Sequence, residues 1–399
     1  MTTTPEWLQS YALLALRINR QIIEQAGGSL LDYRGPTAWL EQAANEEPPP
    51  PGQLVDEANR LLSDLPFDDP QRAAFLAAQT LAMRAAARRL SGQQLPLRDY
   101  VRECLAIEVE WLPETLFEKA HAQLEAALPS GNGSLGERLH AWQAAYRLPT
   151  EQMSRLPQLV SRAVSEARAR LDTVIRLPVD EVIDCTLVSA AGFHGAGAHH
   201  GGTKSTMFIN QDLPFNLADL LYIVTHEGHP GHIAESMLKE IHLVRERGYL
   251  EQQVRFMVSP QYVIGEGLAL NAEAAIFPGD EAQLWLNENV LPEFGMRLDD
   301  CRLVAIHEAR NVLWGAWANA SFMIAQGRSD REVRAYLAQW ALLSEAELTA
   351  MGPGLSLLKA PFAEPYIFCY YHGWQRVRSQ LETHGHQQLR RLLTEQMLP

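Results

Sequence analysis

The chain has few cysteines, and they are not arranged in pairs. Four occur among 399 residues, none of them in a C-x-x-C motif: Cys104, Cys185, Cys301 and Cys369. This spacing argues against a disulfide framework and against a zinc site built from thiolates. It is typical of small buried residues in a reducing compartment.

Positive charge is also scarce. Lysine and arginine together number 34, against 48 aspartate and glutamate residues, so the net charge is −14. This excess of negative charge repels phosphate backbones and anionic lipids, and no basic segment opposes it. We therefore expect no nucleic-acid partner and no membrane partner. A small peptide is the partner that this charge leaves open.

The sequence also lacks a basic leader and a long apolar run at its start. The first 21 residues contain only a short apolar stretch, which ends at Arg17. Such a segment is neither a signal peptide nor a membrane span. Together with the unpaired cysteines, it predicts a cytoplasmic protein. The remaining composition, 47% apolar and 21% charged, is that of an ordinary globular chain.

Apolar residues at helical spacing dominate the chain. They predict helices at 7–26, 54–62, 71–90, 97–128, 135–146 and 150–171, and later at 217–227, 233–247, 251–275, 281–325, 330–344 and 365–395. Residues 46–52 predict a polyproline connector. The fold class is therefore mainly α. We expect an N-terminal helical region at 1–150 and a catalytic helical region at 151–399, and one continuous domain is the alternative.

A small β element interrupts the helices. Residues 182–189 and 206–210 are short and β-rich, and the glycine-loaded segment 192–202 lies between them. This pattern predicts a small antiparallel sheet or hairpin with a long flexible loop. His194, His199 and His200 belong to that loop, which is either a solvated segment or a lid over a site. The strand at 205–210 is either structural or an edge that pairs with an extended peptide.

Histidine is concentrated in one part of the chain, because six of the 13 histidines fall between positions 194 and 232. The last three belong to His226-Glu227-Gly228-His229-Pro230-Gly231-His232. In the H-E-x-x-H zinc motif, two histidines four residues apart share one helix face, and the glutamate reaches a water on the metal. Here proline occupies the fourth position. We therefore expect the helix to end near Gly228 and restart at Pro230, which would return His232 to the metal that His226 binds.

A second acidic motif follows in an apolar helical pattern. Glu266 and Glu273 are seven residues apart and so lie on nearly one helix face. A carboxylate on a buried stripe needs a partner to offset its desolvation, and a metal would be one. Two histidines and a later glutamate form the ligand set of many catalytic zinc sites. Glu266 is the expected third ligand, and Glu273 is expected to orient a histidine.

These two stretches carry a resemblance. HEGHPGHIAE and GEGLALNAE are similar to the paired HE-x-x-PGH and EG-x-A-x-x-x-E motifs of the bacterial family named domain of unknown function 885. Its members are mainly helical and look like zinc metallopeptidases of the gluzincin type. The similarity covers about residues 95–280 and includes the segments 96–139 and 206–214. It implies a multi-helical, zincin-like fold with the β element near the active site.

The resemblance also implies roles for single residues. His226, His232 and Glu266 would be the metal ligands, and Glu227 the general base. Two departures keep His229 open as an alternative second ligand: the family usually has an aromatic residue at this position and often a second histidine where this chain has Ile233. Without a ligand role, His229 would line the pocket.

Further residues are candidates for stabilising the oxyanion. Arg310 stands where the family has a histidine in an R-L-V-x-D-x-G-x-H string, and His307 lies within the same string. The segment 361–374 adds Tyr366, Tyr370 and Tyr371, of which Tyr366 is the leading candidate, since hydroxyl donors serve in acyl-transfer sites.

The sequence thus predicts a zinc-dependent peptidase that acts on short peptides. Zn²⁺ would activate a water, and Glu227 would accept its proton. One alternative keeps the metal and changes the substrate to another amide or ester, because the motif says little about the acyl group. A second alternative is a non-catalytic helical binding protein whose metal site has degenerated.

Overall fold

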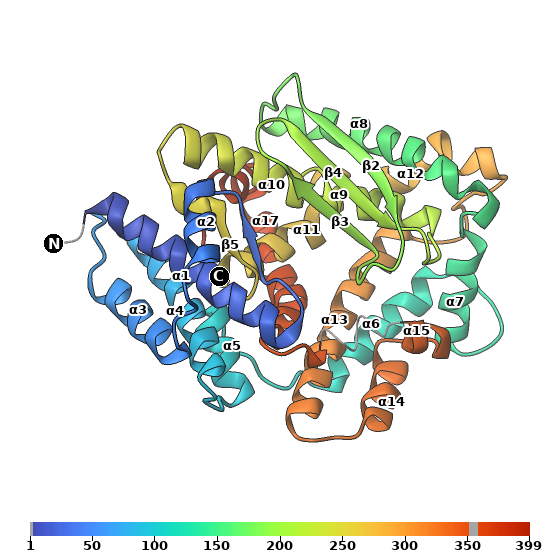
Figure 1. Ribbon diagram of the computed structural model, residues 1–399. Coiled ribbons are helices and arrows are strands. Elements are labelled where there is room, and N and C mark those ends of the chain that lie inside the picture. Colours follow the sequence, from blue (N-terminus) through green and yellow to red (C-terminus); the bar gives the residue numbers. More distant parts are fainter. Residues whose placement is uncertain (1–2, 351–357) are drawn as a thin grey trace.

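The computed structural model describes residues 3–350 and 358–399. Helices dominate these residues, so the mainly α fold class is confirmed (Figure 1). The first half contains α1 (Thr4–Ala26), α2 (Thr37–Asn45), α3 (Pro51–Ser63), α4 (Pro70–Leu90), α5 (Leu97–Leu105), α6 (Glu114–Ala127), α7 (Leu135–Ala145) and α8 (Leu156–Val174). The second half contains α9 (Leu220–Glu227), α10 (His232–Lys239), α11 (Pro260–Ile276), α12 (Glu281–Asn289), α13 (Leu303–Ala325), α14 (Asp330–Trp340), α15 (Glu345–Ala350) and α17 (Phe368–Thr394).

Three of the predicted helices were too long. The helix expected at 97–128 is broken between α5 and α6, where Ala106 has a left-handed backbone (φ 54°) and Pro113 precedes the new helix. Proline disfavours helical backbone in the residue before it, so it stops the pattern there. The segment at 251–275 contains a short strand before α11, and 281–325 divides into α12 and α13. Apolar spacing on both sides of each break concealed it.

The β element is a three-stranded sheet with the order β2-β4-β3 (Figure 1). Its strands are β2 (Val182–Val188), β3 (Gly195–His199) and β4 (Lys204–Asn210). A small antiparallel element is present as expected, but it joins β3 to β4. The two strands predicted from the sequence, β2 and β4, run parallel to each other, because β3 returns the chain between them. A separate antiparallel pair joins β1 (Leu31–Tyr33) to β5 (Val254–Phe256).

The expected flexible loop at 192–202 is wrong in its middle, because five of its eleven residues form β3. Glycine and alanine have little strand propensity, so no pattern in the sequence indicated this strand. The glycines serve close packing instead. A Cβ on Gly197 would lie 2.3 Å from the backbone oxygen of Glu227 in α9. Only glycine lets the strand approach the end of that helix so closely.

The helix α11 lies in the middle of the molecule and packs against α17 and α9 (Figure 1). Fourteen of its residues are buried, among them Glu266 and Glu273. It crosses α17 at two glycines: a Cβ on Gly267 would lie 2.4 Å from the oxygen of Gly373. The glycine after Glu266 therefore permits the crossing that holds the C-terminal helix against this carboxylate.

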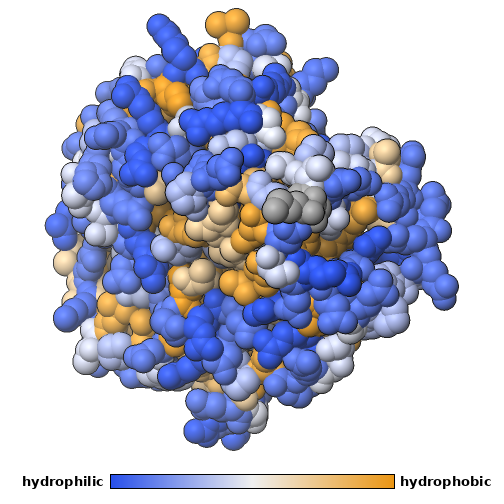
Figure 2. Space-filling view, turned by 90° about the vertical axis from the view of Figure 1, so that its left-hand side faces the viewer, coloured by the Kyte–Doolittle hydropathy of each residue, from blue (hydrophilic) through white to orange (hydrophobic). Residues whose placement is uncertain are grey.

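One apolar core runs through the described residues from Trp7 to Leu393. It includes side chains on both sides of position 150, the expected domain boundary, which stays a prediction. Hydrophilic side chains cover most of the face shown in Figure 2, with apolar side chains gathered near its middle. Within the described part of the chain, no helix is both long enough and apolar enough to cross a membrane.

Candidate metal centre

The break after Glu227 is the local feature that builds the site. The helix α9 ends at Glu227, and α10 begins at His232, two residues later than the expected restart at Pro230. Gly231 makes this turn possible, because a Cβ there would lie 1.7 Å from the backbone oxygen of His226. The close approach of these two backbone segments returns His232 to the side of His226, as expected.

The structure brings the three expected ligands together. Glu266 Oε2 lies 3.6 Å from His226 Nε2, and Glu266 Oε1 lies 3.4 Å from His232 Nε2. The three ligand atoms all lie within 4.8 Å of one another. Atoms bound at about 2.1 Å to one tetrahedral zinc ion are roughly 3.4 Å apart. The spacing of the group therefore suits a common metal better than direct hydrogen bonds.

The burial and the charge of Glu266 also favour a bound metal. Its Oε1 accepts a hydrogen bond from the Tyr366 hydroxyl, whereas Oε2 is buried and has no hydrogen-bond partner among the described residues. A buried carboxylate oxygen without a partner is costly. A bound cation would remove this desolvation cost. The two imidazoles and the carboxylate, together with the unpaired oxygen, therefore fit zinc.

The two histidines respond differently to this carboxylate. Burial opposes the charged form of His232, but the adjacent Glu266 outweighs that effect and raises the pKa of His232 to about 9. Burial lowers the pKa of His226. For Glu266, burial works against ionisation, and the charge of His232 nevertheless holds the pKa of this carboxyl below its usual range. The carboxylate form, which ligates metals, is thus favoured.

Glu227 lies at the edge of the ligand group. Its Oε1 is 3.9 Å from His226 Nε2, and its Oε2 accepts a hydrogen bond of 2.8 Å from the backbone N–H of Gly197. The strand β3 therefore fixes the orientation of this carboxylate. The sequence indicated Glu227 but not Gly197, whose only sign was the dense glycine pattern around it.

His229 lies outside this group, so the structure does not support it as the alternative second ligand. Its ring is completely buried, and Nε2 lies 2.9 Å from Glu181 Oε1. Arg168 contacts the same carboxylate. The other role expected for His229 was to line the pocket, and its complete burial argues against that role as well. Its contact with Glu181 instead connects the helix break to the segment before β2. Glu181 is 48 residues away in the sequence, so no local pattern indicated it as the partner of His229.

His307 and Arg310 belong to a second, neighbouring cluster. His307 Nδ1 lies 2.9 Å from Glu273 Oε1, its Nε2 lies 3.0 Å from Asp219 Oδ1, and Arg310 donates to the same Asp219 oxygen at 2.7 Å. Glu273 thus orients a histidine, as expected, but not one of the metal group. Both ring nitrogens of His307 already have carboxylate partners, which argues against its expected role at the oxyanion. No motif in the sequence indicated Asp219.

Charge in this second cluster is balanced. Burial opposes the imidazolium form of His307, but Glu273 and Asp219 outweigh it and raise the pKa of His307 to about 9. The Arg310 pKa is also raised, because the charge of Asp219 exceeds the effect of burial. Arg310 is held by Asp219, so its expected contact with a substrate would compete with this ion pair.

The three C-terminal tyrosines have separate environments. The Tyr366 hydroxyl donates to Glu266, so it orients a ligand and is committed before any oxyanion forms. Tyr370 packs edge-on against Tyr366 and stacks on Trp314 at 4.4 Å. Tyr371 packs against Trp374, away from these contacts. The expected oxyanion role of Tyr366 is therefore replaced by a positioning role.

Of the three histidines in the glycine-rich segment, only His199 is buried, between Glu240 and Ser205. His194 and His200 are exposed, although His200 contacts the Thr206 hydroxyl and His194 packs edge-on against Phe215, so a role for these two as a lid stays a prediction. The strand at 205–210 is the central strand β4, with β2 and β3 on its two sides. Strand addition at this position is therefore wrong. The two edges of this sheet belong to β2 and β3, and β3 passes Glu227.

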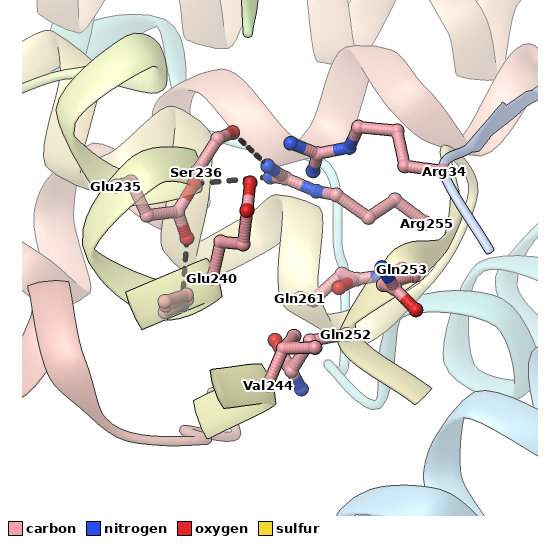
Figure 3. A pocket seen from close by; sticks show the side chains of 10 residues that line it. Arg34, Glu235, Ser236, Glu240, Val244, Gln252, Gln253, Arg255 and Gln261 are labelled. Carbon is pink, nitrogen blue, oxygen red and sulfur yellow. Dashed lines mark hydrogen bonds and ion pairs between the residues drawn. The ribbon is translucent and has the colours of Figure 1, made fainter. Parts of the chain in front are cut away.

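A further cluster of hydrogen-bonded polar side chains holds α10 in place (Figure 3). Glu235 accepts from Lys239 at 2.7 Å and from Arg255 at 3.0 Å, and Arg255 also bonds Ser236. Arg255 belongs to β5, so these bonds attach the helix that carries His232 to the small two-stranded sheet. No pattern in the sequence connects Arg255 with Glu235, because the two residues lie in separate elements.

Comparisons with known proteins show likeness in fold only. Neither a family model nor a curated protein matches the chain. A solved structure described as "the putative lipoprotein from Colwellia psychrerythraea" has 15% identity and a TM-score of 0.54, covering 100% of this chain and 75% of that one. A protein from Shewanella oneidensis, described as "a putative lipoprotein of unknown function", has 10% identity and a TM-score of 0.48, covering 90% and 74%. The resemblance to the 885 family stays a prediction.

Proposed function

We propose that this protein is a zinc-dependent peptidase that hydrolyses short peptides. One observation carries the proposal: His226, His232 and Glu266 converge on a common point beside Glu227. Two imidazoles and a carboxylate are the ligands of many catalytic zinc sites, which leave a fourth position for water or substrate. The resemblance of both motifs to the 885 family supports the same reaction.

The residues around the ligands have distinct tasks in this reaction. Zinc, when bound, supplies Lewis acidity that polarises the scissile carbonyl and lowers the pKa of a water toward about 7. Glu227 accepts the proton of the attacking water and passes it to the leaving amine. The Gly197 N–H holds Glu227 Oε2, which leaves Oε1 directed at the group. Tyr366 holds Glu266 in place.

The edge of β3 suits the main chain of a peptide. His200 N–H donates to Lys204, and Asn210 N–H donates to the oxygen of His194, so the even-numbered residues of this stretch bond to β4. Gly195 and Gly197 then direct their peptide groups outward. The Gly197 N–H is already bonded to Glu227, so Gly195 is the residue that would offer its N–H to a substrate. An extended substrate that pairs there needs no particular side chain. Its scissile bond would pass Glu227, which already contacts this edge.

The Glu227→Gln substitution tests the mechanism. The amide cannot accept a proton, so we expect peptide hydrolysis to fall by about 10²- to 10⁴-fold while zinc stays stoichiometric. Elemental analysis and digestion of a mixed peptide library measure the two quantities. Glu246→Gln, an exposed carboxylate, is the matched control and should keep full activity. Full activity of the Glu227→Gln protein, or absence of zinc after supplementation of the wild type, would contradict the proposal.

We also propose a cytoplasmic location. All four cysteines are free, and three of them are buried, which suits a reducing compartment. The lipoprotein description belongs to the Colwellia protein, and a membrane-attached location is the alternative to test for this chain. Fractionation of cells that express the untagged protein separates the two. Recovery of the protein with the membrane or periplasmic fraction would overturn the cytoplasmic assignment.

A further inference from the structure

A second cavity lies next to the metal centre, on the far side of Tyr222. Its volume is about 310 Å³, and residues of α9, α11, α13 and α17 enclose it. Tyr222 connects the two places, because its ring centroid lies 6.5 Å from that of His226 and 4.7 Å from that of His307, which lines the cavity. Glu273 lies two helical turns beyond Glu266, which places their backbones about 10.5 Å apart. This separation suits a substrate side chain near the reacting bond.

The walls of the cavity combine apolar surface with negative charge. Leu270, Val304 and Leu381 contribute aliphatic side chains. Three glutamates also line it, Glu273, Glu308 and Glu382, against the guanidinium of Arg378 and the ring of His307. Arg378 already contacts Glu308 at 3.1 Å and Glu382 at 2.7 Å. The cavity therefore repels an anionic ligand.

One oxygen in this cavity lacks a donor. Glu273 is only 7% exposed, and its Oε1 bonds His307. Its Oε2 is buried and has no hydrogen-bond partner within the described part of the chain. A buried carboxylate oxygen carries a desolvation cost that a donor from a ligand would offset. A cationic donor would also balance the excess of carboxylates.

We propose that this cavity binds the side chain of a lysine in the peptide substrate. The ammonium group donates to Glu273 Oε2, and the methylene stem lies against Leu270 and Leu381. A long apolar stem with a terminal cation matches both the aliphatic walls and the unpaired oxygen. This inference rests on the proposed peptidase function, since it names a substrate class for that site.

Binding measurements test the pocket without turnover. Zinc-loaded Glu227→Gln protein is titrated calorimetrically with acetyl-Ala-Lys-Ala-amide and with the same peptide carrying norleucine in place of lysine. The two peptides differ only in the terminal ammonium group. We expect the lysine peptide to bind at least about tenfold more tightly, as a charge-assisted hydrogen bond requires. Equal affinities, or no measurable binding of either peptide, would overturn the proposal.

Two variants locate the selectivity. Glu273→Gln, added to this protein, keeps an oxygen for His307 but presents an N–H₂ group to the ammonium, so the preference for lysine should disappear. Glu382→Gln removes the same charge from the same cavity, but its side chain is 63% exposed, and the preference should persist. A preference that survives Glu273→Gln contradicts the assignment. If circular dichroism shows that the Glu273→Gln protein is unfolded, Leu381→Phe is measured in its place. The larger side chain fills the cavity, so the preference for the lysine peptide must disappear in this variant.

Failure of the pocket and failure of the peptidase proposal are distinguishable. If the wild-type protein cuts no peptide while the Glu227→Gln protein still selects lysine, the pocket stands and the peptidase function falls. If the wild type cuts peptides but shows no lysine preference in kcat/KM or in affinity, the function stands and the pocket falls.

Discussion

Two histidine–carboxylate clusters lie along α11, one at Glu266 near its middle and one at Glu273 near its C-terminal end, and their distances separate their roles. Around Glu266, the nitrogen-to-oxygen distances are 3.4 and 3.6 Å, too long for good hydrogen bonds. Around His307, they are 2.9 and 3.0 Å, and each ring nitrogen has its own carboxylate. The same residue types thus form a candidate ligand group around Glu266 and a set of short hydrogen bonds around His307, although each group keeps one unpaired carboxylate oxygen. Residue type alone does not distinguish the two groups, whereas the spacing of their nitrogen and oxygen atoms does.

The largest expected effect that separates the two clusters is a loss of zinc affinity on removal of Glu266. Glu266→Ala removes one of three ligands, so zinc affinity should fall by more than the roughly 10- to 100-fold that the loss of an outer partner causes. Competition with a chromophoric chelator measures it. Glu273→Ala on the same helix is the matched control and should bind zinc as the wild type does. Equal losses in both variants would mean that the two clusters are one site.

Asp219→Asn attacks the other cluster. The change leaves the buried His307 and the half-buried Arg310 with one negative partner fewer, and breaking a buried ion pair costs about 3–5 kcal/mol in the free energy of unfolding. Urea unfolding measures this loss, and zinc stoichiometry should not change. An unaltered unfolding free energy, or a loss of zinc, would show that this network does not serve stability alone.

The pH dependence of stability sharpens the contrast. Folding raises the pKa of His307 from its ordinary 6.5 to about 9, because Asp219 and Glu273 favour the imidazolium over the opposing effect of burial. This stabilisation, about 3 kcal/mol, is complete below pH 6.5 and disappears as the pH rises through 9. Unfolding free energies at pH 6, 7.5 and 9 should therefore decline more steeply for the wild type than for His307→Asn. Parallel pH profiles of the two proteins would contradict the raised pKa.

The smallest expected effect is at Tyr366. Tyr366→Phe removes the hydroxyl that orients Glu266 but leaves the ring in the core, so zinc affinity should fall by about 10- to 100-fold. The structure and the other ligands remain. Tyr371→Phe is the control, because Tyr371 lies in the following helix α17 and packs against Trp374. Unchanged affinity in the Tyr366→Phe protein would leave this tyrosine as a packing residue.

The sequence predicted the local parts of the site better than its distant partners. The His-Glu dipeptide, the Pro-Gly break and the Glu266 helix are short patterns with a direct structural meaning, and the structure brings them together. Glu181, Asp219 and the Gly197 N–H come from elements far from the residues they contact. No spacing rule connects such positions, because tertiary packing alone places them side by side.

The fold shows the same limit. Helix periodicity identified most helices, but a break such as that before Pro113 vanished where apolar spacing continued on both sides. The strand β3 was missed because its glycines are chosen for close approach to α9 and not for strand propensity. Local patterns therefore predict the elements, and backbone contacts between elements decide how they end and pair.

The contact between Gly231 and the His226 carbonyl has a consequence for anyone who transplants this motif. Grafting His226, Glu227 and His232 onto another helix at the same spacing would leave the two imidazoles on different faces, since the alignment depends on a turn that only a residue without Cβ permits. The unit to transfer is the whole seven-residue segment from His226 to His232, together with a strand that has glycine where Gly197 packs against Glu227. A designer who copies the ligands and omits the glycines would copy the chemistry without its geometry.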